Sequence, residues 1–475
     1  MKTKVFYNLA IANCLFMFCT ATNSCDNSEK TLSEEDNTSV KVDFTQEESR
    51  YLSILYKGNS IAPQEALDKI ISQYTDCLTR GDNDLREVGV IYKEEIGVAK
   101  NDTLIPDTLA YLFESRNLGK QYIVSADNRT QQSLLAEFDA LTEGYEMSAT
   151  EVTIMDIIRK GIANYVKNEV RSYEVRKDSI LSEVWHKVQL FDLSDSAEYV
   201  TRQPYPTDYG PDDEYIIDEY TLIGWHEVAF KDALIPVKWH QDEPYNLAVK
   251  DTLSCGTVPT GCVATAVAQI MAYWKNPLTI NGQQVDWNSL TETERILETN
   301  PVKSAKVAAL MKGIFIGCNT IPGCDGSTSN VQSAKSYFQS IGFSTGDVQS
   351  YSSSVIYSSL VNSRPVLITG TNSEYDGHAW IIDGYQRKSE TIRQVIYVYD
   401  RRRQEWIVLS TQDHVYYSTL YHYNWGWRYN SLFDGWFAEN CFDYDDVIYT
   451  LTRNASPSSY EYDVEIIPNI YPNNQ

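Results

Sequence analysis

The stretch TGCVATAVAQIMAYW, residues 260–274, decides the fold of this chain. It is apolar on nearly all sides, rich in Ala, and ends shortly before Pro277, which predicts a buried central helix that begins close to Cys262. The amides and the macrodipole at a helix N-terminus lower the pKa of a thiol there and stabilise its thiolate. The same amides, including that of Cys262, can donate hydrogen bonds to an oxyanion. A structural cysteine in a core helix is the alternative, so the other motifs must decide.

A second motif, GHAWIIDG at residues 377–384, predicts a strand bracketed by glycines, with His378 at its start. A thiolate nucleophile needs a base, usually an imidazole within hydrogen-bond reach. Gly377 leaves room for a substrate backbone to approach the ring. Most lone histidines are structural, but His378 has a setting that the others lack. Those others are His186, His226, His240, His414 and His422.

A third motif, NWGW at residues 424–427, follows the strand-like run 416–423. An Asn424 amide oxygen can accept a hydrogen bond from the imidazole, while the Trp425 indole shields that bond from water. Ordinary aromatic packing at a strand end is the alternative, and it would be preferred if this motif stood alone.

Together these segments resemble the streptopain family of bacterial cysteine peptidases, a distant branch of the papain-like enzymes. The resemblance covers residues 230–445 and has the four motifs in the family's order. The motifs are WHQDEPYN at residues 239–246, GCVATA at 261–266, GHA at 377–379 and NWGW at 424–427. Four weak matches in order make a specific pattern.

The resemblance implies a role for each residue of the reactive centre. Cys262 would be the nucleophile, His378 the proton acceptor and the Gln241 side chain an oxyanion donor. Asn424 and Trp425 would support the histidine.

The resemblance also implies which residues line the substrate cleft. They are Gly377, Trp427, and Ser327 and Ser329 of the small polar loop 326–330. Protein or peptide substrates are therefore expected, and no cofactor or metal is implied, only a reduced thiol.

The expected fold class is α+β. A papain-like catalytic domain, with a central helix packed on an antiparallel sheet, would follow an α+β propeptide domain. Residues 119–128 resemble the propeptide of the family, which implies that the chain's own propeptide acts as an inhibitor by occluding the cleft. Two other functions stay open: acyl transfer to an amine by a transglutaminase-like enzyme of the same fold, and a catalytically inactive surface binding protein.

The chain has 475 residues, 43% of them apolar, which predicts two or more domains. Residues 200–220 contain several prolines and an acidic run, so they mark the best boundary and an exposed site for proteolytic cutting. The expected domains are a signal peptide at 1–24, a lipidated tether at 25–50, a propeptide at 51–225 and a catalytic domain at 226–475.

The N-terminal residues predict export. Lys2 and Lys4 precede an apolar run, residues 5–21, that is short for a membrane span, and Cys25 follows a small residue, as in a bacterial lipoprotein signal. Lipidation of Cys25 would place the protein in the cell envelope, at the outer membrane or the cell surface. Ordinary signal-peptidase cleavage and secretion are the alternative. A net charge of −25 argues against nucleic-acid binding and against membrane attachment by anything but a lipid anchor.

The rest of the chain gives further structural expectations. A helix is expected from Pro63, a hairpin from the runs 111–113 and 122–124, and long helices over 131–188. Because an oxidising compartment permits disulfides, Cys318 and Cys324 could close a small loop.

Two departures from the family pattern stand out. Arg428 and Tyr429 replace the usual glycines after NWGW. A charged hairpin-like insertion spans residues 397–409, with three arginines, 401–403, at its tip. A solvated turn is the favoured interpretation of that tip, and substrate docking is the alternative.

Overall fold

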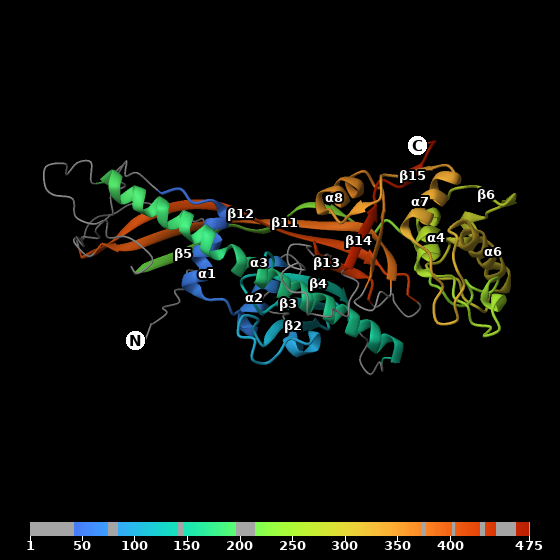
Figure 1. Ribbon diagram of the computed structural model, residues 1–475, viewed down its shortest axis with the longest axis horizontal. Helices are drawn as coiled ribbons and strands as arrows, with labels where there is room; N and C mark the ends of the chain where they lie inside the picture. Colours follow the sequence, from blue (N-terminus) through green and yellow to red (C-terminus); the bar gives the residue numbers. More distant parts are fainter. Residues whose placement is uncertain are drawn as a thin grey trace, which may run out of the picture. The chain divides into compact units, whose positions relative to one another are not determined.

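The computed structural model describes residues 42–74, 84–140, 147, 149–195, 214–371, 377–400, 404–427, 433–442 and 462–474 (Figure 1). The predictions for the signal peptide, for Cys25, for most of the connector 200–220, for the arginines 401–403 and for Arg428 and Tyr429 lie outside these residues. Residues 41–475 form one compact unit. Among the described residues, none of the helices has the length and apolar character needed to cross a membrane.

The first part of the chain, up to residue 231, builds a four-stranded meander with helices. In order, its elements are α1 (Gln46–Lys57), α2 (Pro63–Gln73), β1 (Arg86–Tyr92), the 3₁₀ turn η1 (Lys93–Ile96), β2 (Thr108–Ser115), β3 (Lys120–Ser125), β4 (Leu134–Asp139), α3 (Ala149–Asp195) and β5 (Tyr215–Lys231).

The remainder of the chain adds helices and a second set of strands. They are η3 (Lys250–Thr252), α4 (Cys262–Trp274), β6 (Thr279–Ile280), β7 (Gln283–Gln284), α5 (Trp287–Leu290), α6 (Pro301–Gly317), α7 (Val331–Ser340), β8 (Phe343–Ser344), β9 (Gln349–Ser350), α8 (Ser353–Val361), β10 (Val366–Thr371), β11 (Gly377–Asp400), β12 (Glu405–Asn424), β13 (Gly435–Ala438), β14 (Tyr462–Ile467) and β15 (Tyr471–Pro472).

One antiparallel sheet runs through both parts of the chain. Its order is β1-β2-β3-β4-β13-β12-β11-β10-β14-β9, and β5 pairs with β11 beside this path. The expected α+β class, with a central helix packed on an antiparallel sheet, is therefore confirmed. The buried helix α4 packs against β11, α6 and α7, and its apolar side chains form one core with those of α6 and α7 (Figure 1).

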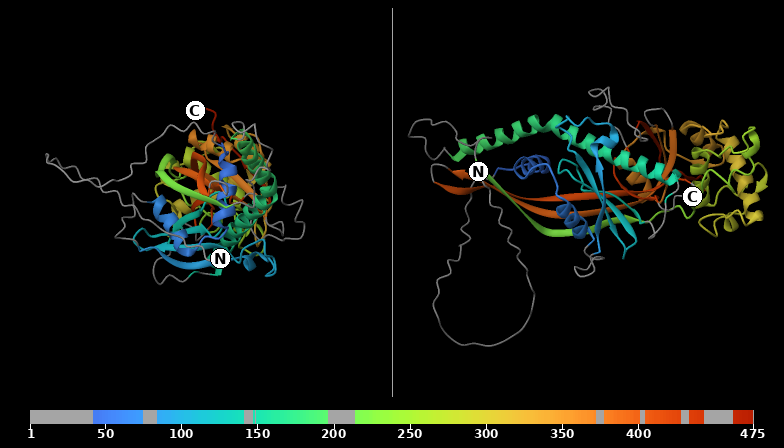
Figure 2. Two further views of the ribbon diagram at one scale, coloured as in Figure 1. Left: turned by 90° about the vertical axis from the view of Figure 1, so that its left-hand side faces the viewer. Right: turned by 90° about the horizontal axis from the view of Figure 1, so that it is seen from below.

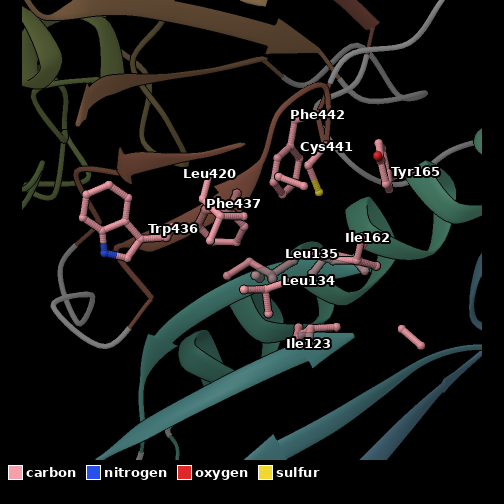
Figure 3. Packing of buried hydrophobic residues seen from close by; sticks show 14 of the residues in the cluster. Ile123, Leu134, Leu135, Ile162, Tyr165, Leu420, Trp436, Phe437, Cys441 and Phe442 are labelled. Carbon is pink, nitrogen blue, oxygen red and sulfur yellow. The ribbon is translucent and has the colours of Figure 1, made fainter. Parts of the chain in front are cut away.

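Residues 42–195, which we call the pro-region after the propeptide predicted there, meet the rest of the chain along β4 and β13. Ala136 of β4 pairs with Phe437 of β13, so the edges of these two short strands close into one ladder. Figure 3 shows the buried side chains on both sides of this junction, with Leu134 and Leu135 of β4 near Phe437 of β13. Gly161 of α3 allows close packing there, since a Cβ at that position would lie 2.3 Å from the Phe442 ring.

The predicted insertion at 397–409 is the end of a long hairpin formed by β11 and β12. The strand β5 pairs with the same part of β11, from Lys231 opposite Tyr385 to Tyr215 opposite Val398, so a three-stranded ribbon results. We call this ribbon, β5 with residues 385–400 and 404–418, the insertion ribbon. The pro-region covers part of it, because α1 and α3 share a buried core with Ile396, Val398 and Leu409 (Figure 2).

The predictions for the pro-region succeed locally and fail once. The helix from Pro63 and the hairpin are confirmed, with Tyr111 opposite Val124 in the β2–β3 pair. The prediction of long helices over 131–188 is wrong at its start, because residues 134–139 form β4 between β3 and β13. Pairing on both edges there outweighs local helix propensity. The expected domain border at 225/226 falls inside β5, which runs without interruption from 215 to 231.

Candidate active site

The helix α4 presents Cys262 at its first turn, as the sequence predicts. Gly261 is the N-cap residue and has φ 84° and ψ 146°, a conformation that is essentially restricted to glycine. A Cβ there would lie 2.9 Å from the backbone oxygen of Ser327. Glycine is therefore required before Cys262 by its backbone angles and by the approach of the neighbouring loop.

The sulfur of Cys262 lies between α4 and the start of β11. The backbone N–H groups of Cys262, Val263 and Ala379 hydrogen-bond to it and favour the thiolate. Desolvation is the larger effect, however, and raises the pKa of the Cys262 thiol above its usual range. The expectation that the helix N-terminus lowers this pKa is therefore not met in the structure, because burial has the larger effect on the thiol.

The imidazole of His378 is held in one orientation by the end of β12. His378 is the second residue of β11, pairs with Gly370 of β10 and is only 5% exposed. Its Nε2 lies 2.9 Å from the carbonyl oxygen of Trp425. A carbonyl can only accept, so Nε2 carries the proton and Nδ1 is the basic nitrogen of the neutral ring. Desolvation lowers the pKa of His378 to about 4, against the smaller opposing effect of the Trp425 carbonyl.

A stack of indoles covers the imidazole. The Trp427 ring lies 4.9 Å from the His378 ring at an angle of 25°, and the Trp425 ring lies 4.8 Å from that of Trp427 at 2°. Trp380 belongs to the same cluster, and its ring lies 6.0 Å from the His378 ring. The predicted shielding of the histidine is thus provided chiefly by Trp427, which the family resemblance assigns to the substrate cleft.

The expected hydrogen bond from the imidazole to the Asn424 amide is not formed. The Asn424 side chain points into the interior, where Oδ1 accepts from Gln269 Nε2 at 3.1 Å and Nδ2 donates to the Val237 carbonyl at 3.2 Å. Strand alternation explains the difference, because it turns successive side chains to opposite faces, and the Trp425 carbonyl then reaches His378. Asn424 joins the end of β12 to α4 and thereby supports the histidine indirectly.

The backbone of Gln241 is held by Thr260, which lies two residues before Cys262 in the chain. Its carbonyl accepts hydrogen bonds from the N–H of Thr260 at 2.9 Å and from the Thr260 hydroxyl at 3.3 Å. The Gln241 side chain is half-buried. This placement is compatible with the predicted oxyanion role of Gln241.

The residues expected in the cleft have different surroundings in the structure. Ser327 is buried against Gly261, and its hydroxyl donates to the Pro259 carbonyl at 2.7 Å. Ser329 instead donates to the carbonyl of Cys318 at 2.5 Å, at the end of α6. Gly377 is exposed at the start of β11, and a Cβ there would be in ordinary van der Waals contact, at 3.8 Å, with the Gly370 carbonyl oxygen and with Thr371.

A disulfide joins Cys255 and Cys324, which connects the segment before α4 to the loop that carries Ser327. The suggested Cys318–Cys324 loop is therefore wrong, because Cys318 is buried as a free thiol. Neither fixed spacing nor composition identifies a pairing across 69 residues.

Sequence reasoning also missed a second carboxylate–imidazole pair behind the site. His422 Nδ1 lies 2.6 Å from Asp383 Oδ1. The His422 side chain is largely buried and that of Asp383 is fully buried. Asp434 faces the same histidine and accepts a hydrogen bond from the Trp425 N–H at 2.9 Å. The available signal was that Asp383 lies on the strand of His378, and His422 two residues before Asn424.

Comparisons with known proteins give one family match and two distant structural likenesses. The model of the peptidase C10 family matches residues 239–437. Curated protein sequences give no match. The chain resembles two solved structures from Prevotella intermedia. One is a mutant fragment of prointerpain A, at 16% identity and a TM-score of 0.43, covering 76% of this chain and 96% of the fragment.

The other is the active wild-type interpain A cysteine protease, at 18% identity and a TM-score of 0.35, covering 52% of this chain and 96% of that one. These structural likenesses are distant, whereas the family match contains all four motifs of the site. Residues 239–437 therefore match the peptidase C10 family, the streptopain family of cysteine peptidases that the motifs indicate.

Proposed function

We propose that this chain is the zymogen of a cysteine endopeptidase that uses Cys262 as nucleophile and His378 as base. One observation carries the proposal: the N–H of Ala379, the residue directly after His378, hydrogen-bonds to the Cys262 sulfur. This bond brings the N-terminus of α4 and the start of β11 to the same point. The Trp425 carbonyl then selects the tautomer in which Nδ1 of the histidine can take a proton.

Peptide hydrolysis follows from these positions in two halves. His378 Nδ1 accepts the thiol proton, and the Cys262 sulfur attacks the peptide carbonyl carbon. The N–H of Cys262 and the side chain of Gln241 stabilise the oxyanion. The intermediate collapses to a thioester as His378 protonates the departing amine, and a water activated by His378 then releases the acid and restores the thiol.

Two features support the zymogen part of the proposal. The raised pKa of Cys262 and the lowered pKa of His378 favour a neutral thiol and a neutral imidazole, which is the less reactive form of the dyad. In addition, β4 of the pro-region is paired with β13, next to the strand whose end holds His378. Cleavage in the connector 200–220, followed by loss of the β4–β13 pairing, would rearrange this edge and rehydrate the site.

The proposal extends to location, for which the support is in the sequence. Cys25 would be lipidated after removal of residues 1–24, and the enzyme would be held at the cell envelope. Mass spectrometry of the mature N-terminus tests this: a diacylated or triacylated Cys25 supports a lipoprotein, whereas a free N-terminus at another residue supports secretion.

The catalytic assignment is tested with Cys262→Ala in the full chain. We expect loss of casein cleavage and of self-processing, with an unchanged thermal unfolding transition. Cys441→Ala is the matched control, because it removes another cysteine that forms no disulfide and lies outside the site. A Cys262→Ala protein that still cleaves casein would refute the assignment. If an added amine diverts most of the product from the free acid to the amide, the protein is an acyltransferase. If a thiol-reactive epoxide inhibitor fails to label Cys262 in the processed protein, the protein is a binding protein.

A further inference from the structure

Asp434 lies just before β13 and contacts the residue that orients the base. Its Oδ1 accepts a hydrogen bond from the Trp425 N–H at 2.9 Å. The carbonyl of the same Trp425 accepts the hydrogen bond from His378 Nε2, also at 2.9 Å. Asp434 and His378 therefore hold the two ends of one residue's backbone. A shift of the Trp425 backbone would be transmitted directly to the imidazole.

A buried ion pair supports Asp434 from behind. His422 of β12 lies 2.6 Å from Asp383 of β11, and the second oxygen of Asp383 accepts from the Ile235 N–H at 2.8 Å. The carboxylates of Asp383 and Asp434 raise the pKa of His422 although its burial opposes this. The ring of His422 also packs edge-on against Trp436 of β13, the strand that follows Asp434. His422 is thus held against the Asp383 carboxylate, and the negative charge of Asp434 acts on the same ring.

We propose that Asp434, backed by the Asp383–His422 pair, is a positioning residue for the reaction: its carboxylate fixes the Trp425 backbone, and the Trp425 carbonyl holds His378 with Nδ1 as the basic nitrogen. This inference rests on the proposed peptidase function. It assigns the tautomer of the base to two hydrogen bonds on the Trp425 backbone, with the Asp383–His422 pair behind them, a combination that no motif of the sequence contains as a unit. Asp434 itself does not touch the substrate or the reacting atoms.

The charge of Asp434 gives the inference a measurable signature. A carboxylate accepts an N–H bond more strongly than a neutral acid or an amide does. Burial raises the pKa of Asp434 to about 6, while the Trp425 N–H, His422 and Lys238 act in the opposite direction and Asp383 adds to the rise. Protonation of Asp434 below about pH 6 would weaken its hold on Trp425.

Two variants separate geometry from charge. Asp434→Asn keeps an oxygen that can accept from Trp425 but cannot titrate, whereas Asp434→Ala removes the acceptor. The variants are compared as processed enzyme, with active sites counted by epoxide labelling. We expect Asp434→Ala to lower kcat by about 10- to 100-fold and to change KM by no more than about twofold, because small misplacements of a catalytic group have effects of this size. Asp434→Asn should lower kcat by less than about tenfold. It should also lack the part of the fall in kcat below pH 6 that protonation of Asp434 causes in the wild type.

The matched control is Asp413→Asn, which removes a carboxylate from an exposed ion pair with Arg393 on the insertion ribbon and should leave kcat, KM and the pH profile unchanged. An Asp434→Ala enzyme with an unchanged kcat, or an Asp434→Asn enzyme with the wild-type acid limb, would overturn the inference.

A readout without turnover keeps the inference separate from the proposed function. In the Cys262→Ala zymogen labelled with ¹⁵N-histidine, the His378 ring should show a protonated Nε2 and an unprotonated Nδ1 at pH 7. The Asp434→Asn version should keep this pattern, and the Asp434→Ala version should show a mixture of tautomers. An unchanged pattern in Asp434→Ala protein that remains folded by its thermal transition would overturn the inference even if the peptidase assignment holds.

Discussion

Replacing Gly261 by alanine is the sharpest test of how the fold positions the nucleophile. The substitution adds one methyl group directly before Cys262. The backbone there has φ 84° and ψ 146°, and the new Cβ would be placed 2.9 Å from the backbone oxygen of Ser327. Real Cβ atoms do not approach a backbone oxygen so closely, so either the N-terminus of α4 or the Ser327 loop must move.

The size of the effect follows from two contributions. Holding a residue other than glycine in this backbone region costs about 1–3 kcal/mol. The Ser327 loop cannot easily move away from the new methyl group. The Ser327 hydroxyl donates a hydrogen bond to the Pro259 carbonyl, and the nearby Cys255–Cys324 disulfide joins the loop to the segment before α4. Overpacking at a restrained position of this kind costs roughly a further 1–3 kcal/mol. We therefore expect the free energy of unfolding to fall by about 2–6 kcal/mol.

Chemical denaturation of the Cys262→Ala zymogen, with and without Gly261→Ala, measures the change in stability without self-processing. Casein cleavage by the variant that retains Cys262 measures the displacement of the sulfur, and we expect a loss of at least about 10²-fold because misplacement by about 1 Å has this effect. Gly224→Ala in β5 is the matched control, because open space surrounds its position, and both measurements should stay at their wild-type values. Full activity together with a stability loss below about 0.5 kcal/mol would refute the reasoning, since such a change is typical of an unconstrained surface site.

Three further predictions concern other parts of the structure. Replacing both Cys255 and Cys324 by alanine opens a link across 69 residues and should lower the free energy of unfolding by about 2–4 kcal/mol, as measured by denaturation with and without reductant. The pKa of His378 in the folded state is lowered to about 4, so the unfolded chain binds the proton first as pH falls. The free energy of unfolding should therefore decline by about 3 kcal/mol between pH 6.5 and pH 4. His378→Gln should remove this dependence in a pH series of denaturation curves. Leu409→Ala in the core between the insertion ribbon and the pro-region should cost about 2–5 kcal/mol, whereas Val408→Ala on the exposed face should change thermal stability by less than about 0.5 kcal/mol.

Local sequence was sufficient for the parts of the site that one element builds. The Ala-rich run after Gly261 forms α4 from Cys262 to Trp274, and the glycine-bracketed run forms the start of β11 with His378 as its second residue. Apolar periodicity and chain-breaking residues encode such elements directly. The same reasoning predicted α2 and the β2–β3 hairpin.

Local sequence misled where a partner distant in the chain determines the outcome. Residues 134–139 are a strand because β3 and β13 pair with both of its edges, and β13 lies almost 300 residues further along the chain. Cys324 pairs with Cys255 rather than Cys318 because α6 carries Cys318 into the core, where its thiol stays free.

The sequence by itself determined the helix that presents Cys262 and the strand that presents His378, and it predicted these two residues as the reactive groups, because each inference depends on residue types at short spacing. Only the tertiary structure decided how these groups are oriented and charged. The Trp425 carbonyl rather than the Asn424 amide holds His378, since strand alternation turns the Asn424 side chain inward. Burial outweighs the helix N-terminus and raises the pKa of Cys262, because desolvation depends on everything that surrounds the sulfur and a dipole depends on one helix.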